Sequence, residues 1–123
     1  MVRMLKTVVL SALVTMALGA HAQSTATKAA DGTWTDAKGM TLYVFDKDAG
    51  GKSVCNGPCA ALWPPYMATG EAKAAGDWTV IARDDGAKQW SYKGKPLYGF
   101  SKDAKAGDKT GDNFNSVWHV AKD

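Results

Sequence analysis

The residues best suited to chemistry in this chain are Cys55, Cys59, Met67 and His119. The two cysteines are the only ones in the sequence, and four positions separate them. In an oxidising compartment an even cysteine count at this spacing predicts a disulfide. On a helical turn their Cα atoms would lie about 6 Å apart, within the range that a disulfide spans. Two alternatives remain: an exchanging thiol pair, or a copper site formed by the two thiolates with Met67 and His119.

His119 limits the enzymatic possibilities. Apart from His21 in the N-terminal apolar segment, it is the only histidine in the chain. A nucleophile–histidine–acid triad or a histidine-bearing zinc site would therefore have to use it. It lies in the alternating stretch 117–120, where we expect an ordinary surface-facing strand position. We assign no catalytic residue and expect a non-enzymatic protein.

Asp46 and Asp48 precede glycines, as in the start of a calcium-binding loop. The EF-hand pattern requires a ligand at position 5, a glycine at position 6 and an acidic residue at position 12. Those positions are Gly50, Gly51 and Gly57 here, so two of the three requirements fail. We instead expect Asp48 to be structural, with its carboxylate accepting hydrogen bonds from the backbone of the following loop.

An internal repeat with a constant offset of 55 residues organises the chain. Residues 39–48 recur as residues 94–103, with six of the ten positions identical. The same offset pairs Trp63 with Trp118 without a gap. An offset kept over 25 residues indicates a duplication. The recurring residues are Tyr43, Phe45, Asp48 and Trp63 in the first unit, and Tyr98, Phe100, Asp103 and Trp118 in the second.

The recurring aromatic residues have two interpretations. Aromatic side chains bury a large area each, so in a small domain we expect them to form the core. The alternative is a ligand groove in which duplicated aromatic faces stack on a sugar, a ring or a peptide.

Short apolar segments separated by turn signals predict an all-β fold. We expect a small sandwich or barrel-like meander of two pseudo-symmetric β units. Pro58 directly after Gly57 predicts a short helical turn around residues 57–62, which Pro64 and Pro65 would end. The expected strands are residues 33–36, 41–45, 78–83, 88–92, 97–100 and 117–120.

The N-terminus has the features of a secretory signal peptide. Arg3 and Lys6 precede an apolar run at residues 7–18, and a small-x-small cleavage pattern ends at Ala22. An apolar run of about 12 residues is too short to anchor in a bilayer. We expect residues 1–22 to be cleaved, residues 23–31 to be a disordered lead-in, and residues 32–123 to form one β domain whose repeats cover about 32–68 and 78–121.

Charge argues against several partners. Removal of Arg3 and Lys6 leaves 13 basic residues against 12 acidic ones. This balance offers no basic footprint for nucleic acid or an anionic membrane. We expect a periplasmic or secreted monomer without a cofactor or a stable membrane span. Its partner would be an envelope ligand or protein that the sequence does not identify.

Three patterns together resemble a known family. The pattern Tyr-x-aromatic-x-x-Asp occurs at residues 43–48 and 98–103, and Ser-x-Cys-x-Gly-x-Cys-Ala-x-x-Trp-Pro-Pro occurs at residues 53–65. Asp85, Gly86 and Gln89 follow, and then Gly-Lys-Pro-Leu-Tyr at residues 94–98. With these patterns, which span nearly all of residues 32–123, the chain resembles the bacterial secreted-repeat family, often described as predicted lipoproteins. The resemblance implies an exported, duplicated protein without an established activity. This chain lacks the lipobox cysteine, so we do not carry membrane anchoring over.

Overall fold

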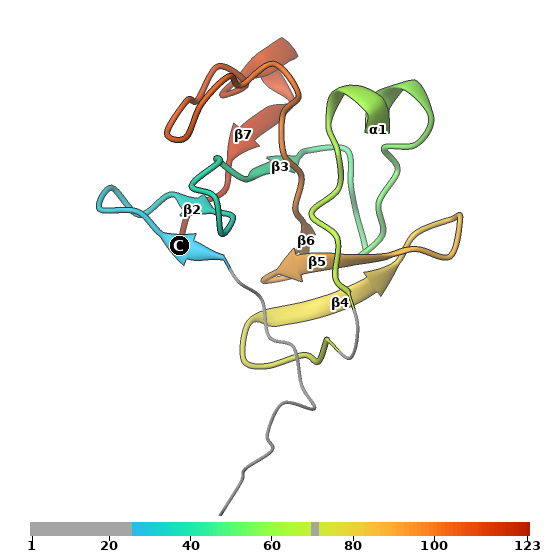
Figure 1. Cartoon of the computed structure of the whole chain (residues 1–123). Helices are drawn as coiled ribbons and strands as arrows, with labels where there is room; N and C mark the ends of the chain where they lie inside the picture. Colours follow the sequence, from blue (N-terminus) through green and yellow to red (C-terminus); the bar gives the residue numbers. More distant parts are fainter. Residues whose placement is uncertain (1–25, 70–71) are drawn as a thin grey trace, which may run out of the picture.

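The computed structural model describes residues 26–69 and 72–123 (Figure 1). The signal peptide predicted for residues 1–22 lies outside the described residues. Most of the regular structure consists of short strands, with one short helix and one 3-10 turn. The elements are β1 (Thr27–Lys28), β2 (Trp34–Thr35), β3 (Tyr43–Phe45), α1 (Pro58–Leu62), β4 (Trp78–Ala82), β5 (Lys88–Tyr92), β6 (Lys95–Pro96), η2 (Phe114–Ser116) and β7 (Trp118–Val120).

The strands form three small antiparallel sheets, β1-β2, β3-β7 and β4-β5-β6. The all-β prediction is therefore confirmed, and within the described residues the strands do not close into a barrel. The longest pairing is the hairpin of β4 and β5, which runs in register from Trp78 opposite Tyr92 to Ala82 opposite Lys88. Gly86 allows its tight turn because the backbone there has a φ of 87°, a conformation that glycine adopts without strain.

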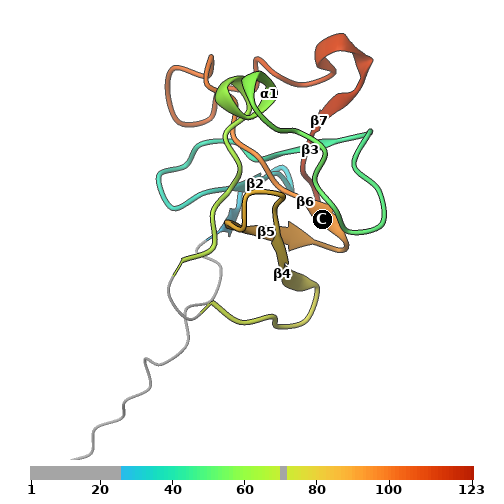
Figure 2. The same ribbon diagram turned by 90° about the vertical axis from the view of Figure 1, so that its right-hand side faces the viewer.

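The predicted helical turn is confirmed as α1. Pro58 occupies its first turn, where the missing backbone N–H costs no hydrogen bond. The backbone N–H of Trp63 donates to the carbonyl of Cys59 at 2.8 Å and closes the last turn. Pro64 follows directly and cannot continue the helix. In both Figure 1 and Figure 2, α1 lies on the opposite side of β3 from the β4–β5 hairpin.

The two repeats meet at the centre of the molecule. Tyr43 and Tyr98 face each other as an antiparallel pair, and each backbone N–H donates to the other residue's carbonyl, at 2.8 and 3.0 Å. On its other edge β3 pairs with β7. The segment around Tyr98 pairs in the same way with Pro65. The order across the centre is therefore β7, β3, the segment at residue 98 and the segment at residue 65.

Backbone hydrogen bonds confirm that the two units are pseudo-symmetric. The N–H of Ala121 donates to the carbonyl of Leu42 at 2.8 Å. The equivalent residues, 55 positions away, make the same bond, from Tyr66 to Leu97 at 2.8 Å. The sequence repeat is thus an approximate two-fold symmetry that passes between Tyr43 and Tyr98.

Two hydrophobic clusters lie on opposite faces of these central strands. Because side chains alternate along a strand, Tyr43 and Phe45 point to one face while Leu42 and Val44 point to the other. The first cluster is built on Tyr43, Cys55, Trp63, Tyr98, Phe100, Trp118 and Val120. The second is built on Leu42, Tyr92, Leu97 and Ala121.

Four stacked aromatic rings form the middle of the first cluster. The central pair consists of the equivalent residues Trp63 and Trp118, whose ring centroids lie 3.8 Å apart with the planes inclined by 4°. Phe45 stacks on Trp118 at 4.1 Å, and Phe100 stacks on Trp63 at 4.0 Å. The repeated aromatic residues therefore pack against one another in the core.

The structure corrects the predicted N-terminal boundary. We expected a disordered lead-in over residues 23–31, yet Thr27 and Lys28 form β1 and pair with β2. Lys28 also forms an ion pair with Asp123 at 2.5 Å. The prediction was wrong for residues 27 and 28, because their polar composition carries no sign of a pairing that depends on β2 and on a residue far along the chain. Residues 23–25 of the predicted lead-in lie outside the described residues.

A second difference concerns the strand predicted at residues 97–100. Residues 97–100 form only the isolated bridges of Tyr98, and the regular strand, β6, comprises Lys95 and Pro96 directly before them. It forms the edge of the β4-β5-β6 sheet, a position where proline is tolerated. A tight turn with positive φ at Lys93 and Gly94 connects it to β5.

Candidate functional site: a buried polar network and two related grooves

The tyrosines and aspartates of the repeat are hydrogen-bonded between the two units. The hydroxyl of Tyr43 donates to Asp103 Oδ2 at 2.7 Å. The hydroxyl of Tyr98 donates to Asp48 Oδ2 at 2.6 Å. Each aspartate thus belongs to the opposite repeat from its tyrosine. The two polar ends of the Tyr-x-aromatic-x-x-Asp pattern join the units to each other.

The second oxygen of each aspartate holds the adjoining loop. Asp48 Oδ1 accepts a hydrogen bond from the backbone N–H of Val54 at 2.8 Å. Asp103 Oδ1 accepts one from the backbone N–H of Thr110 at 3.0 Å and another from the Thr110 hydroxyl. Both carboxylates therefore connect the end of a central strand to the loop that follows it.

Burial shifts the pKa values of Tyr43, Tyr98 and Asp48. Desolvation raises the pKa of Tyr43 and of Tyr98 above the ordinary phenol value, and the hydrogen bonds to Asp103 and Asp48 raise both further. Desolvation also raises the pKa of Asp48 above its usual range, against the opposing effect of its hydrogen bonds. The phenols stay protonated at neutral pH and act as hydrogen-bond donors rather than as nucleophiles.

Arg83 is a buried residue that the sequence analysis did not single out. Its guanidinium donates to Ser53 Oγ at 2.9 Å, to Gln89 Oε1 at 2.8 Å and to the carbonyl of Cys55 at 2.6 Å. Ser53 in turn lies 2.6 Å from the Tyr98 hydroxyl. The only available signal was composition, because Arg83 is the sole arginine outside the predicted signal peptide.

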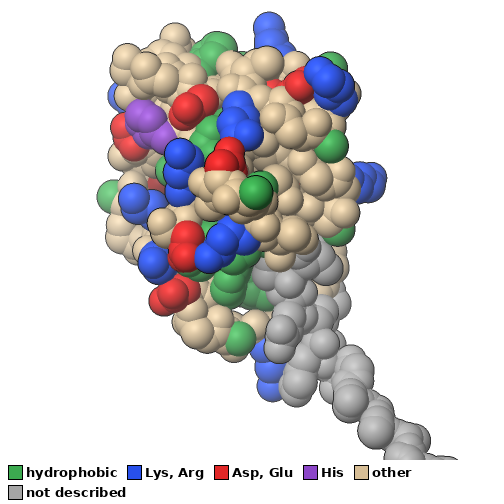
Figure 3. Space-filling view, turned by 90° about the vertical axis from the view of Figure 1, so that its left-hand side faces the viewer, with side chains coloured by type: hydrophobic (Ala, Val, Ile, Leu, Met, Phe, Trp, Pro, Cys, Tyr) green, Lys and Arg blue, Asp and Glu red, His purple; other side chains and the backbone are tan. Residues whose placement is uncertain are grey.

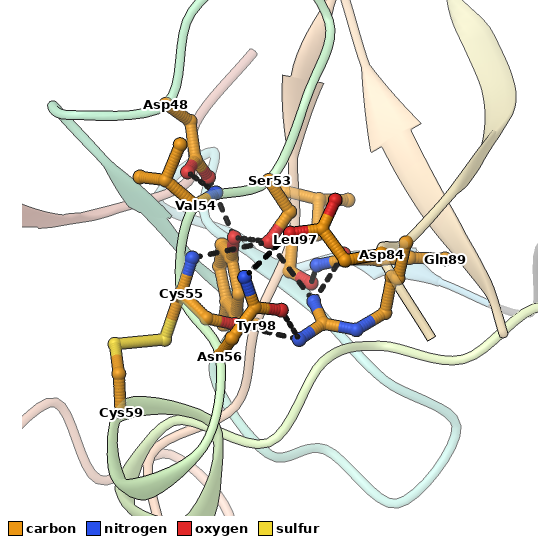
Figure 4. The surroundings of a disulfide bond; sticks show 11 residues. Asp48, Ser53, Val54, Cys55, Asn56, Cys59, Asp84, Gln89, Leu97 and Tyr98 are labelled. Atoms are coloured by element: carbon orange, nitrogen blue, oxygen red, sulfur yellow. Dashed lines mark hydrogen bonds between the residues drawn. A yellow bond between two sulfur atoms is a disulfide. The ribbon is translucent and has the colours of Figure 1, made fainter. Parts of the chain in front are cut away.

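Figure 4 shows how this network adjoins the cysteines. The Arg83 guanidinium reaches Asp48 through Ser53 and Tyr98, so a buried positive charge connects to a carboxylate by a chain of hydrogen bonds. A buried charge is costly unless it is hydrogen-bonded and electrostatically compensated. We infer that the network joins the loop of the first unit to Arg83 and Tyr98 of the second unit rather than presenting a reactive group.

The predicted disulfide is present. Cys55 and Cys59 are bonded, with their Cα atoms 5.2 Å apart. The bond ties the loop at the buried Cys55 to α1 (Figure 4). The equivalent positions in the second unit are Thr110, which binds Asp103, and Phe114, which packs against the stacked rings. The two units thus fix the same region by different means.

The structure does not bring Met67 and His119 together with free cysteine thiols to form a copper site. Met67 is exposed and bridges to Gln89, while His119 Nε2 lies 2.7 Å from Asp46 Oδ2. Across residues 26–69 and 72–123, no three His, Cys, Asp or Glu side chains form a group that could hold a metal ion. A cysteine sulfur binds metal as a thiolate and not as part of a disulfide, so copper binding at Cys55 and Cys59 would require reduction of their bond.

Two surface grooves flank the central strands. The first, here called the lysine groove, has a volume of about 310 Å³. A smaller hollow of about 130 Å³ adjoins it and shares Val44, Asp46 and Lys95 with it. Figure 3 shows the face that carries the histidine, where basic and acidic side chains are interspersed. The polar residues that line the lysine groove include Asp46, Lys93, Lys95, His119 and Lys122.

The second groove, here called the proline groove, has a volume of about 230 Å³. Its lining is more apolar, with Asp36 and Asp103 as the charged residues. The other lining residues include Met40, Pro64, Pro65, Tyr66 and Phe100.

The two grooves are related by the repeat. Met40 in the proline groove is equivalent to Lys95 in the lysine groove, and Pro64 is equivalent to His119. The apolar walls correspond as well, since Pro65 is equivalent to Val120. The duplicated scaffold therefore presents two equivalent grooves whose side chains have become chemically different.

These features define a small, duplicated all-β module whose motif residues join its two halves. The model of a family described as a secreted repeat of unknown function matches residues 25–67 and 79–122, one segment for each unit. The chain belongs to this family of secreted repeats. Searches of curated proteins and of solved structures find no significant match.

Within residues 26–69 and 72–123, no helix has both the length and the apolar character needed to span a bilayer.

Proposed function

We propose that this protein is an exported, non-enzymatic binding module of the bacterial cell envelope, cleaved after Ala22 and presenting its two grooves to ligands. The secreted character of the family and the signal-peptide pattern of residues 1–22 support export.

One observation carries the binding role. The polar residues of the repeat motif form hydrogen bonds with one another. The lysine groove and the proline groove, in contrast, occupy equivalent positions but have different side chains. Structural needs explain the Tyr43–Asp103 and Tyr98–Asp48 bonds, which are alike in the two units. They do not explain the divergence of Lys95 from Met40 and of His119 from Pro64, since these residues line the surface grooves. Grooves lined by apolar walls and a few polar groups are the usual form of a small-molecule site.

The test uses two exchange variants, Lys95→Met and Met40→Lys, each of which gives one groove the residue of the other. The mature protein is screened by thermal shift against peptides, glycans and small anionic and neutral molecules. A ligand of either groove raises the melting temperature of the wild type, and one exchange variant lowers or removes that response. A ligand whose effect is the same in both variants would contradict the proposal.

A parallel measurement addresses the copper or thiol-redox alternative. Protein isolated from the periplasm is analysed for metal and for free thiols, together with the Cys55→Ser/Cys59→Ser variant. We expect no free thiol, no stoichiometric metal and equal ligand binding by the two proteins. Stoichiometric copper that is lost in the variant, or thiol exchange that depends on Cys55 and Cys59, would replace the proposed function.

A further inference from the structure

Three cationic or ionisable side chains reach the lysine groove from two paired backbone segments, one at β6 and one at β7 and the residues that follow it. Lys95 lies in β6 opposite Tyr92, and His119 lies in β7 opposite Val44. Lys122 follows β7 and bridges to Thr33. Because backbone pairing fixes all three positions, the arrangement is preorganised rather than dependent on a mobile loop.

The ion pairs of this region leave two of its lysines available. Lys93 lies 3.8 Å from Asp123 and is also positioned over the Tyr92 ring. Among the described residues, neither Lys95 nor Lys122 forms a salt bridge or a side-chain hydrogen bond, and both are exposed. Their charges are therefore free to meet a ligand.

The negative charge within the groove is partly engaged. Asp46 Oδ2 lies 2.7 Å from His119 Nε2. In the adjoining hollow, Asp48 is held by Tyr98 and by the backbone of Val54. The apolar part of the groove wall includes Val44 and Val120.

We propose that the lysine groove binds a multiply charged anion, a small molecule bearing phosphate or carboxylate groups, through Lys95 and Lys122 with His119 beside them. This inference rests on the proposed binding function and names the ligand class of one groove. A lysine ammonium is a compact point charge without the planar fork of arginine. Charge and size should therefore determine recognition more than bidentate geometry.

The proline groove provides an internal contrast. At the positions equivalent to Lys95 and His119 it has Met40 and Pro64, and none of its lining residues is a lysine. The same scaffold should therefore not bind anions on that side.

The experiment is an NMR titration of the mature protein at low ionic strength, with tripolyphosphate, citrate and glucose as separate probes. Saturable amide shifts are expected for Val44, Lys95, His119 and Lys122 with at least one of the two anions and not with glucose. The anion that binds identifies phosphate or carboxylate as the preferred group. Added salt should weaken the binding, because exposed charges are screened.

Three charge variants locate the site. Lys95→Gln and Lys122→Gln should each weaken binding by about three- to fivefold, and Asp46→Asn should strengthen it by a similar factor. The matched control is Lys88→Gln, which makes the same charge change at the opposite end of β5 from Tyr92 and should leave affinity unchanged.

The inference is overturned if neither anion gives saturable shifts, or if Lys88→Gln weakens binding as much as Lys95→Gln. If either of these outcomes occurs but a neutral ligand binds in the proline groove, the proposed binding function still stands. Absence of any ligand for either groove would instead remove both.

Discussion

Tyr43 and Tyr98 connect the two repeats across the pseudo-two-fold axis in two ways. Their backbones form a reciprocal pair of hydrogen bonds at 2.8 and 3.0 Å, and each phenol binds the aspartate of the repeat that contains the other tyrosine. A single unit would contain both polar groups of the pattern without the partners that satisfy them here. An unsatisfied buried polar group is costly, so the two repeats depend on each other for stability.

The exchange between repeats predicts which pairs of substitutions are coupled. Tyr98→Phe should lower the free energy of unfolding by about 1–3 kcal/mol, because Asp48 and Ser53 lose a buried hydrogen-bond partner. In a double-mutant cycle measured by urea denaturation, Tyr98→Phe and Asp48→Asn should be non-additive. Tyr43→Phe combined with Asp48→Asn serves as the control and should be additive, since Tyr43 binds Asp103. Coupling of Asp48 to Tyr43 instead would contradict the arrangement.

A pair of glycine substitutions tests the packing of the stacked rings. A Cβ atom on Gly111 would lie 2.6 Å from a Trp63 ring carbon and 2.9 Å from a Phe100 ring carbon. Gly111→Ala should therefore destabilise the fold by about 1–3 kcal/mol, the usual cost of overpacking a core. At Gly99 the nearest atom is 3.9 Å away, so Gly99→Ala should be tolerated. Equal melting temperatures for the two variants would show that the rings do not enclose Gly111.

The disulfide should contribute modestly to stability. It closes a loop of very few residues, so loss of the bond in Cys55→Ser/Cys59→Ser should cost about 2 kcal/mol or less. The second unit, with Thr110 and Phe114 at these positions, shows that the same region can be held without sulfur. Chemical denaturation should report a folded variant with a lower midpoint, and failure of the variant to fold would contradict this expectation.

Asp123 makes stability depend on acid pH. Its hydrogen bond with Lys28, then that with Tyr92, lowers the pKa of the carboxyl from 3.8 to about 2. A carboxyl with a lowered pKa in the folded state contributes stability above its unfolded pKa, and that contribution disappears as the pH falls through the folded value. Thermal melting between about pH 4 and pH 2 should therefore show a smaller loss of stability for Asp123→Asn than for the wild type. Asp85→Asn is the control, and an identical pH profile for wild type and Asp123→Asn would count against the contact with β1.

Local signals in the sequence determined a large part of this structure. The constant offset of 55 residues predicts the two-fold relation, because equivalent sequences adopt equivalent backbones. Alternation along residues 42–45 predicts which side chains share a face, since successive strand residues point in opposite directions. The Gly57-Pro58 start of α1 and the Cys55–Cys59 bond are likewise local, because they involve residues only a few positions apart.

Tertiary structure alone decided the rest. The repeat identifies Tyr43 and Asp48 as equivalent to Tyr98 and Asp103, but periodicity does not show that each tyrosine binds the aspartate of the other unit. The pairing of β1, the burial of Arg83 and the lining of the two grooves also depend on residues far apart in the chain. Such contacts arise when the units pack across the two-fold axis, and a sequence pattern reports the face of a strand but not what lies opposite that face.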